Sequence, residues 1–193
     1  MIYNFNLIID KFISELIPLT KKNVLQGNKI FGAFILNKED YSTVAINSNN
    51  EIKNPLLHGE ISTINSFFLD NSNIDPKNCI FISSHEPCSL CLSAITWSGF
   101  DNFLYFFPYE DTENEFNIPH DLRILKEVFK IDKGLYNQEN YFWKSYSILT
   151  EINKLNDDFF DKNIIKIKKI KEKYKNLSQI YQKNKNNNKI PLN

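Results

Sequence analysis

Two short polar clusters constrain this chain more than any other feature. The tripeptide His-Gly-Glu occupies residues 58–60, and the pentapeptide Pro-Cys-Ser-Leu-Cys occupies residues 87–91. His58, Cys88 and Cys91 offer three ligands to a zinc ion, and no fourth cysteine lies nearby to complete the coordination. A structural zinc site usually closes with four protein ligands, whereas a catalytic site has three and leaves one position for water. The pattern therefore favours a catalytic zinc site over a structural one.

The hydrophobic pattern around the two clusters indicates how they are held. Apolar residues recur at helical spacing over residues 59–69, and a second, mostly apolar helix is expected over residues 87–97, opened by its proline. The zinc ligands and Glu60 then lie at the first turns of two helices, with the two cysteines on one face of the second helix. The partial positive charge at a helix N-terminus favours thiolate over thiol, and zinc ligation requires thiolate.

Two other readings of these residues stay open. A Cys-x-x-Cys pair also occurs in structural zinc knuckles and in redox sites. His85 stands three residues before Cys88 and competes as a ligand, but it ends an apolar run and has no Glu two residues later. We therefore expect His85 beside the site or in a loop. The remaining cysteine, Cys79, lies in an apolar run and is expected in the core.

A His-x-Glu followed by Pro-Cys-x-x-Cys resembles the zinc-dependent nucleobase and nucleoside deaminases of the cytidine/deoxycytidylate deaminase-like superfamily. The run Phe-Gly-Ala at residues 31–33 is similar to a strand opening in the branch of guanine, cytosine and tRNA-adenosine deaminases. The resemblance covers roughly residues 30–115. It implies an α/β fold, a three-layer α-β-α arrangement with a mixed central sheet. It also implies one Zn²⁺ per chain and hydrolytic removal of an exocyclic amine as ammonia.

The charge of the expected metal site suggests the chemistry. Zinc held by two thiolates and a neutral imidazole is formally neutral, so a bound water can lose its proton near neutral pH. The resemblance implies that Glu60 is not a ligand but the catalytic acid/base. It would take the proton of that water, pass it to a ring nitrogen and protonate the departing ammonia.

Four residues are candidates for substrate contacts. By the resemblance, Asn47 stands where an Asn eleven residues before the zinc His hydrogen-bonds the substrate, although Asn in such a loop also suits a plain turn. Glu86 is delivered with the Cys pair at the end of a strand, and Trp97 lies on the second zinc helix. Asp111, in an acidic run after the next strand, could read an exocyclic amine or a ring N–H, or be part of a solvated turn.

Periodicity predicts the remaining elements and two parts of the chain. We expect residues 1–150 to form the catalytic domain and residues 151–193 a Lys-rich helical extension with a frayed tail. The expected elements are a helix over 5–19, a loop over 21–29, strands over 30–36, 41–46, 79–84 and 100–107, a helix over 119–131 and a helical segment from 141. The order strand, helix, strand, helix, strand implies parallel pairing of the later strands.

From residue 158 the apolar side chains recur in steps of three and four, which predicts a long amphipathic helix. Its other faces carry many lysines, and such a basic strip either holds RNA phosphates or is simply solvated. The apolar stripe consists of Phe160, Ile164, Ile167, Ile170, Tyr174, Leu177 and Tyr181. The lysines are Lys162, Lys166, Lys168, Lys169, Lys171, Lys173 and Lys175. The Asn-rich end, residues 178–193, is expected to fray.

Composition bounds the class of protein. A chain of 193 residues with 16 Phe and 9 Tyr can bury a core, and three cysteines indicate a reduced compartment without a disulfide framework. No uncharged stretch approaches the ~18 residues of a membrane span. We therefore expect a cytoplasmic protein, and a homodimer by analogy.

The predicted function is a zinc-dependent deaminase of a nucleobase, nucleoside or nucleotide of the guanine, cytosine or cytidine type. The first alternative is a tRNA-specific adenosine deaminase, with tRNA as partner. The second is a zinc-binding subunit without catalytic activity.

Overall fold

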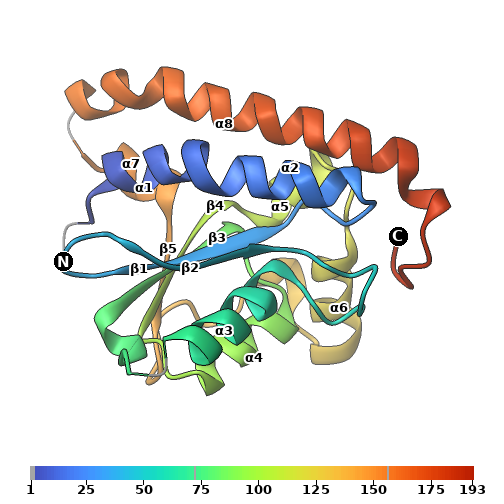
Figure 1. Ribbon diagram of the computed structural model, residues 1–193, viewed down its shortest axis with the longest axis horizontal. Helices are drawn as coiled ribbons and strands as arrows, with labels where there is room; N and C mark the ends of the chain where they lie inside the picture. Colours follow the sequence, from blue (N-terminus) through green and yellow to red (C-terminus); the bar gives the residue numbers. More distant parts are fainter. Residues whose placement is uncertain (1–2, 72, 156) are drawn as a thin grey trace.

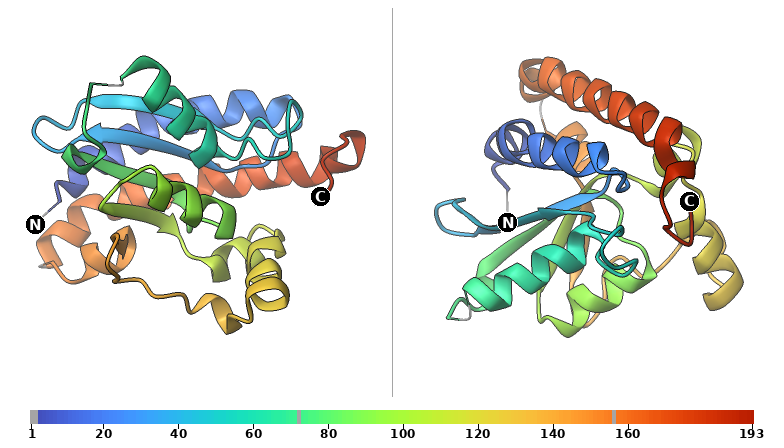
Figure 2. Two further views of the ribbon diagram at one scale, coloured as in Figure 1. Left: turned by 90° about the horizontal axis from the view of Figure 1, so that it is seen from below. Right: turned by 45° about the vertical axis from the view of Figure 1, so that its right-hand side comes forward.

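The computed structural model describes residues 3–71, 73–155 and 157–193, and in the last range it describes side chains from residue 163 onwards. A five-stranded sheet lies between two layers of helices (Figures 1 and 2). Helices α1, α2 and α8 cover one face, and α3 and α4 cover the other. The elements are α1 Phe5–Lys11, η1 Phe12–Leu16, α2 Ile17–Leu25, β1 Gly32–Asn37, β2 Thr43–Ser48, α3 Gly59–Asp70, η2 Pro76–Asn78, β3 Cys79–His85, α4 Ser89–Trp97, β4 Asn102–Phe107, α5 Tyr109–Asn114, α6 His120–Phe129, η3 Asp132–Gly134, β5 Lys144–Ser147, α7 Ile148–Asn153, α8 Asp157–Asn184 and η4 Lys185–Asn187.

The sheet is mixed, as the sequence predicted. Its strand order is β2-β1-β3-β4-β5. Strand β1 pairs antiparallel with β2 and with β3, whereas β3, β4 and β5 run parallel. Each parallel connection crosses over through helical structure, α4 after β3 and α5 with α6 after β4. The carboxyl ends of β3 and β4 therefore open toward the same edge, where the residues of the candidate site lie.

The central strands are buried on both faces, and their side chains alternate between two cores. Phe34, Leu36 and Ile82 pack under α1, α2 and α8. Ala33, Ile35 and Phe81 point the other way and pack under α3 and α4. This two-sided burial explains why these strands read as continuous apolar runs in the sequence.

The first helical segment is longer than predicted. It continues through a π-helical turn, Phe12–Leu16, into α2 and ends at Leu25, so the loop expected over residues 21–29 is wrong for its first half. Lys21 and Lys22 are exposed, Asn23 donates to the Ser48 hydroxyl at 2.7 Å, and Val24 is buried. The π turn stands next to Pro18, whose nitrogen cannot donate to the carbonyl four residues earlier.

Two further stretches differ from expectation. Residues 109–114, for which a solvated turn was one alternative, form the helix α5, and residues 144–147, inside the helical segment expected from residue 141, form β5. Strand β5 owes its conformation to pairing beside β4, with Asn102 opposite Lys144 and Tyr105 opposite Ser147. Such pairing is tertiary and overrides the local apolar pattern. The helix expected next begins only at Ile148.

The long C-terminal helix is part of the main core. Its side chains Ile167, Ile170, Tyr174, Leu177 and Tyr181 are buried in the same cluster as Phe12 of the N-terminal segment, whereas Phe160 and Lys162 lie outside the described side chains. The division after residue 150 stays a prediction, and α7, Ile148–Asn153, spans that position.

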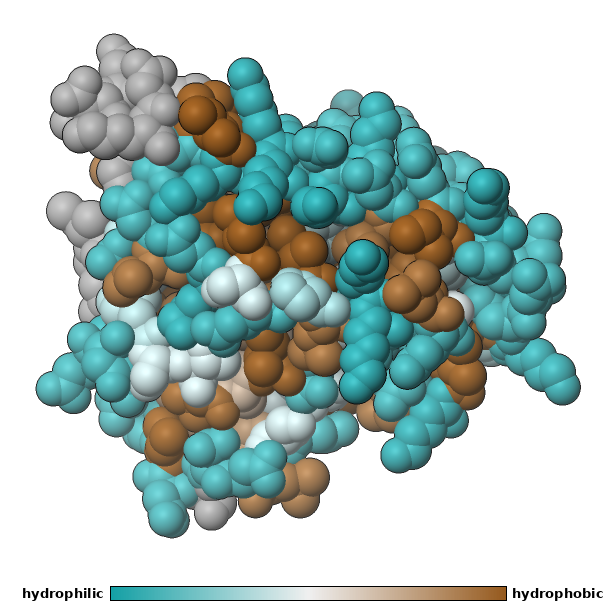
Figure 3. All heavy atoms as spheres, turned by 45° about the horizontal axis from the view of Figure 1, so that its top comes forward, coloured by the Kyte–Doolittle hydropathy of each residue, from teal (hydrophilic) through white to brown (hydrophobic). Residues whose placement is uncertain are grey.

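The face over α8 is mostly hydrophilic, with apolar patches between the polar side chains (Figure 3). On it, Lys166 forms an ion pair with Asp10 of α1, with Nζ and Oδ1 2.6 Å apart. Among the described helices, none combines the length and the apolar character that a bilayer crossing needs.

Candidate zinc and substrate site

The three expected zinc ligands come together at the start of two neighbouring helices. His58 is the N-cap residue of α3, Cys88 is the N-cap residue of α4, and Cys91 lies in the first turn of α4. The Nδ1 atom of His58 lies 3.4 Å from the Sγ of Cys88 and 3.6 Å from the Sγ of Cys91. The two sulfur atoms are 3.5 Å apart. His58 thus precedes the first helical turn by one residue, and the structure brings together the three side chains that the sequence suggested as ligands.

These spacings fit one tetrahedral zinc ion. With Zn–S of about 2.3 Å and Zn–N of about 2.0 Å, tetrahedral ligand atoms lie roughly 3.5–3.8 Å from one another. Among the described residues, only His58, Cys88 and Cys91 form a group of three or more such side chains close enough to hold a metal ion. The hydrogen bond with Cys91 and the nearby His58 lower the pKa of Cys88, while burial raises that of Cys91. These three residues fit a zinc site, and among the described residues no fourth protein ligand joins the group.

Glu60, the expected acid/base, is buried beside these three residues. Its Oε1 accepts a hydrogen bond of 2.7 Å from the Ser83 hydroxyl of β3, and its Oε2 lies 3.3 Å from the Sγ of Cys91. Burial is the main cause that raises the pKa of the Glu60 carboxyl, and a bound zinc ion would oppose that shift. Ser83 therefore holds one oxygen, and the other faces the metal position.

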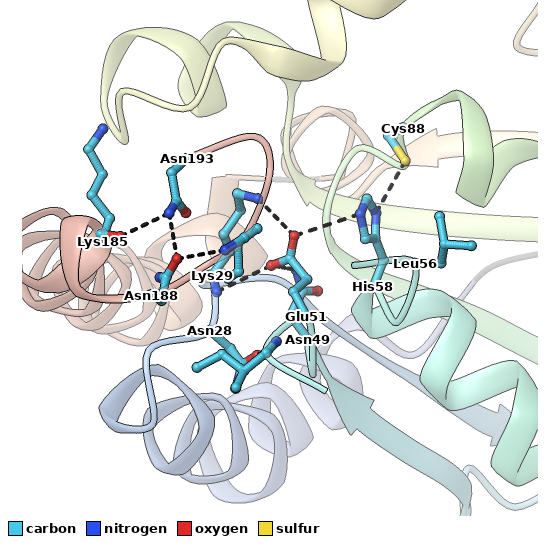
Figure 4. A network of polar contacts seen from close by, with 12 residues as sticks. Asn28, Lys29, Asn49, Glu51, Leu56, His58, Cys88, Lys185, Asn188 and Asn193 are labelled. Carbon is cyan, nitrogen blue, oxygen red and sulfur yellow. Dashed lines mark hydrogen bonds and ion pairs between the residues drawn. The ribbon is translucent and has the colours of Figure 1, made fainter. Parts of the chain in front are cut away.

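A buried polar network flanks the other side of the His58 ring (Figure 4). Glu51 accepts hydrogen bonds from Lys29 Nζ, at 2.7 Å, and from Asn49 Nδ2, at 2.8 Å. Its Oε1 lies 3.9 Å from the Nε2 of His58. The Oδ1 of Asn49 accepts a hydrogen bond of 2.6 Å from the backbone N–H of Gly59, the first residue of α3. The network thus connects the loop after β2 to the helix start that carries the ligand.

A cavity of about 220 Å³ opens next to His58 and Cys88. Its apolar wall includes side chains from distant parts of the chain, namely Phe31, Leu56, Ile118, Ile124, Ile190 and Leu192. Its polar groups are Lys29, Glu51, His120 and Asp121. A smaller inner cavity joins Phe31, His58, Cys88 and Asp121 to Glu60 and Glu86. Asp121 therefore faces both the metal ligands and the larger cavity, from the first turn of α6.

Of the predicted substrate contacts, only Glu86 lines one of the two cavities, the smaller inner one. The Glu86 carboxylate is buried and accepts hydrogen bonds from the backbone N–H of Tyr109, at 3.1 Å, and the hydroxyl of Tyr136, at 2.9 Å. These bonds fix Glu86 on the floor beside Cys88. Burial is the main cause that raises its pKa.

The other three candidates do not line either cavity. The amide of Asn47 donates to α3, to the Ser62 carbonyl at 3.2 Å and the Ser66 hydroxyl at 2.8 Å. Trp97 is 91% exposed at the end of α4. Asp111 lies in the first turn of α5 and is half-buried. Asn47 points away because it is still in β2, whereas Asn49, two residues on, has left the strand and turns toward the site.

Sequence reasoning missed Asn49, Glu51, Lys29, Asp121 and the C-terminal segment as parts of the site. Two signals existed. Asp121 stands in the first turn of a predicted helix, where an acid complements the helix dipole. An apolar Ile-Pro-Leu run at residues 190–192 interrupts an otherwise polar tail. That tail, which was expected to fray, is held by a hydrogen bond of 2.9 Å from Asn188 Nδ2 to the Gly27 carbonyl.

His85 and Cys79 lie where the sequence suggested. His85 ends β3, and its ring is packed among aromatic rings with centroids 4.7 to 5.4 Å away, those of Phe31, Phe107, Phe116 and Tyr174. Burial lowers the pKa of His85 well below its usual value, so the ring is neutral at pH 7. It is not a member of the ligand group. Cys79 is buried in the core.

Comparison with known proteins agrees with this geometry. A probable cytosine deaminase of Schizosaccharomyces pombe is 23% identical over 94 residues, which cover 49% of this chain and 57% of that protein. This chain therefore spans little more than half the length of that relative.

Solved structures give the same picture. The Bacillus subtilis guanine deaminase is 25% identical, with a TM-score of 0.54 over 68% of this chain and 85% of that one. Guanine deaminase from Nitrosomonas europaea (16% identity, TM-score 0.54, 82% and 80% covered) and a tRNA:A34 deaminase (14%, 0.52, 72% and 97%) share the fold.

The family model for the cytidine and deoxycytidylate deaminase zinc-binding region matches residues 8–107, about half of the chain. That stretch contains all three zinc ligands and Glu60. The chain therefore belongs to the cytidine and deoxycytidylate deaminase family.

Proposed function

We propose that this protein removes the exocyclic amine of a free nucleobase, of the guanine or cytosine type, by hydrolysis. The observation that carries the proposal is the position of Glu60, fixed by Ser83 and facing the three-ligand site at 3.3 Å from the Sγ of Cys91. When bound, zinc would lower the pKa of a water molecule so that hydroxide is present near neutral pH. The three ligands would hold the ion, and the remaining steps fall to side chains of this chain.

Glu60 performs the proton transfers in this proposal. Its free oxygen accepts the proton of the attacking water and donates it to the ring nitrogen next to the reacting carbon. Glu60 then accepts the hydroxyl proton of the tetrahedral adduct and donates it to the exocyclic nitrogen, so that the carbon–nitrogen bond breaks, ammonia leaves and the carbon keeps the oxygen as a carbonyl. Ser83 keeps the carboxylate oriented throughout, and the buried surroundings exclude competing water.

The charges of the cavity favour a substrate without phosphate. Apart from the zinc ligand His58, the basic side chains that line it are Lys29, which is buried and paired with Glu51 at 2.7 Å, and His120. Burial and the neighbouring Lys29 lower the pKa of His120, so its ring is neutral at pH 7. Among the described lining residues, no unpaired cation remains for a nucleotide phosphate. The apolar wall instead suits the faces of a flat ring.

The position of Asp121 favours a free base over a nucleoside as the substrate. A carboxylate accepts N–H hydrogen bonds, and a free base carries a ring N–H at the nitrogen that bears the sugar in a nucleoside. Asp121 lines both cavities, so it lies between the metal ligands and the larger space. In this proposal it takes the role that the sequence assigned to Asp111. Burial raises the pKa of Asp121, and a bound zinc ion would oppose that shift by favouring the ionised form.

The two alternatives receive less support. A tRNA substrate must place a base in the pocket with its phosphates outside, yet residues 190–192 of the tail cover one wall of the cavity. A zinc-binding subunit without activity would have no use for a carboxylate that Ser83 aims at the metal position.

The test is ammonia release from guanine, cytosine, adenine, cytidine, dCMP and tRNA by zinc-loaded protein, with Glu60→Gln as the control. We expect turnover of guanine or cytosine, much weaker turnover of cytidine and dCMP, and none by the variant. Preferred turnover of dCMP or tRNA would overturn the free-base proposal. Absence of turnover on the whole panel would favour the subunit alternative.

We also propose that the chain forms a homodimer. The Trp143 indole donates to the Thr96 hydroxyl at 2.8 Å, which brings the loop before β5 next to the end of α4. Trp97, Tyr141 and Phe142 follow or precede these residues and are exposed. Large exposed apolar side chains that gather on one surface are typical of protein interfaces. Gel filtration with light scattering tests the dimer, and a monomer would exclude it.

A further inference from the structure

The carboxylate of Glu51 has no role in the proton transfers, yet it is one of the most thoroughly held groups in the molecule. It is buried in the loop between β2 and α3. Lys29 Nζ donates to it at 2.7 Å, Asn49 Nδ2 at 2.8 Å and the Lys29 backbone N–H at 3.4 Å. A buried carboxylate loses its hydration, and such a set of partners is needed to offset that loss.

The carboxylate faces the zinc ligand from the side opposite the metal position. The Nδ1 of His58 lies within 3.6 Å of both sulfur atoms, whereas its Nε2 lies 3.9 Å from the Oε1 of Glu51 (Figure 4). An imidazole that binds a metal through Nδ1 carries its proton on Nε2, so that proton is directed toward Glu51. The distance exceeds that of a hydrogen bond and is within reach of charge interaction with the carboxylate.

We propose that Glu51 is a positioning residue for the zinc ligand His58, and that Lys29 and Asn49 fix the Glu51 carboxylate for this purpose. A carboxylate beside the distal nitrogen selects the tautomer that leaves Nδ1 free for the metal, limits ring rotation and increases the electron density that the ring donates. Asn49 also accepts from the Gly59 N–H, so the same network sets the start of α3 relative to the ring. The inference rests on the zinc site of the proposed function and not on the identity of the substrate.

A merely structural role for Glu51 makes a different prediction. If the Lys29–Glu51 pair only held the loop, its loss would lower stability and leave the zinc affinity of the folded protein unchanged. Asp101 offers a matched control, because it too pairs with a lysine, Lys38, at 2.8 Å, and it lies outside both cavities. Variants of the two acids therefore separate loss of an ion pair from loss of ligand positioning.

The experiment measures the zinc dissociation constants of the variants Glu51→Gln, Glu51→Asp and Asp101→Asn by competition with a chromogenic chelator. No substrate is present, and the temperature is one at which circular dichroism shows that each variant is folded. Cobalt-substituted samples report the ligand geometry through their d–d absorption bands. We expect Glu51→Gln to weaken zinc binding by roughly 10- to 100-fold and to shift the cobalt bands. Asp101→Asn should match the unmodified chain in both readouts.

Glu51→Asp keeps the charge but withdraws the carboxylate by one methylene group, and we expect it to weaken zinc binding as well. If Glu51→Gln does not fold, the zinc affinity of Glu51→Asp tests the proposal instead. Zinc affinity within twofold of the unmodified chain in the folded Glu51 variants, with unchanged cobalt bands, would overturn the proposal. Failure of the free-base proposal would appear separately, as the wrong substrate preference in the ammonia assay with zinc affinity unaffected.

Discussion

Gly59, the first residue of α3, meets Gly32, the first residue of β1, backbone against backbone. A Cβ built on Gly59 would lie 2.6 Å from the Cα of Gly32 and 2.9 Å from its nitrogen. Only hydrogen at position 59 permits this approach, because backbone atoms of a central strand cannot move aside as a side chain can. The contact sets how deeply the N-terminus of α3, with His58 at its cap, reaches toward the sheet.

We therefore expect Gly59→Ala to destabilise the protein by about 3 kcal/mol, at the upper end of the usual cost of overpacking, and to weaken zinc binding. Gly32→Ala is the control, because its Cβ would meet the side chains of Leu16 at 2.9 Å and Thr20 at 3.0 Å, and its nearest backbone atom, the Asn47 carbonyl oxygen, only at 3.2 Å. Urea unfolding of both variants measures the difference. Equal stability losses in the two variants would show that the backbone contact is not the limiting one.

Replacing Glu60 separates metal binding from proton transfer. Glu60→Gln keeps the shape of the side chain and its contact with Ser83, but it cannot accept a proton. We expect zinc content of one ion per chain and a loss of turnover of at least about 10²-fold, the usual contribution of a positioned general base. Metal analysis and ammonia release on the same sample provide the check. A variant that retains turnover would exclude Glu60 as the acid/base.

The pH dependence of stability has a local source in the Lys38–Asp101 pair, which joins the end of β1 to the residue before β4. Burial alone would raise the pKa of Asp101, but hydrogen bonds from Lys38 and Asn102 outweigh it and lower the pKa. A lowered pKa in the folded state stabilises the fold above the unfolded value, about 3.9, and this contribution is lost as the pH falls through the folded pKa.

Accordingly, Asp101→Asn should melt at a lower temperature than the unmodified chain at pH 7, and the two melting temperatures should converge as the pH falls below about 4. Thermal unfolding followed by circular dichroism from pH 3 to 7 measures this. Added salt should reduce the difference at pH 7, since the pair is partly exposed. A difference that stays constant with pH would assign the effect to packing.

The zinc site could be predicted because its determinants are local. Each half lies in a stretch of five residues or fewer, and the helix pattern after each half places the ligands at two helix N-termini. The order of strands and helices likewise implied the parallel pairing of β3 with β4. Both predictions use information within about 30 residues of chain.

The residues that line the cavity beside the zinc ligands could not be predicted, because they depend on where helices and strands end and on how distant segments of the chain pack. Asn47 and Asn49 differ only in that β2 ends between them, at Ser48. Asp111 and Asp121 both follow β4, and only the placement of α6 against the cavity decides between them. The tail residue Ile190 reaches the site from the opposite end of the sequence.

Asp121 can be tested against Asp111, the acid that the sequence suggested. Asp121→Asn removes the charge that accepts a ring N–H, and a hydrogen bond to a charged group contributes about 1.5–3 kcal/mol. We expect kcat/KM for the preferred free base to fall by roughly 10- to 150-fold, with zinc content unchanged. Asp111→Asn should leave kcat/KM unaltered, because that residue lies outside both cavities. A fall in kcat/KM for Asp111→Asn with unaltered kcat/KM for Asp121→Asn would assign the substrate contact to Asp111 instead.

The C-terminal segment lines one wall of the cavity, and Asn188 holds it there. Its Nδ2 donates to the Gly27 carbonyl at 2.9 Å, and its Oδ1 accepts from the Ile190 N–H at 3.0 Å. Ile190, 6% exposed, lies in the cavity wall as a result. The same Oδ1 also accepts from the side-chain amide of Asn193. Neutral hydrogen bonds contribute about 1 kcal/mol each, so the loss of these three should release the wall for part of the time.

We expect Asn188→Ala to raise KM for the free base by about 10-fold with a smaller change in kcat, because the wall contributes to binding and not to proton transfer. Hydrogen exchange at residues 186–193 should speed up in the same variant. Asn186→Ala is the matched control, since that neighbouring side chain is exposed. A rise in KM of the same size in both variants would mean that general loosening of the tail, and not the Asn188 contacts, controls access to the cavity.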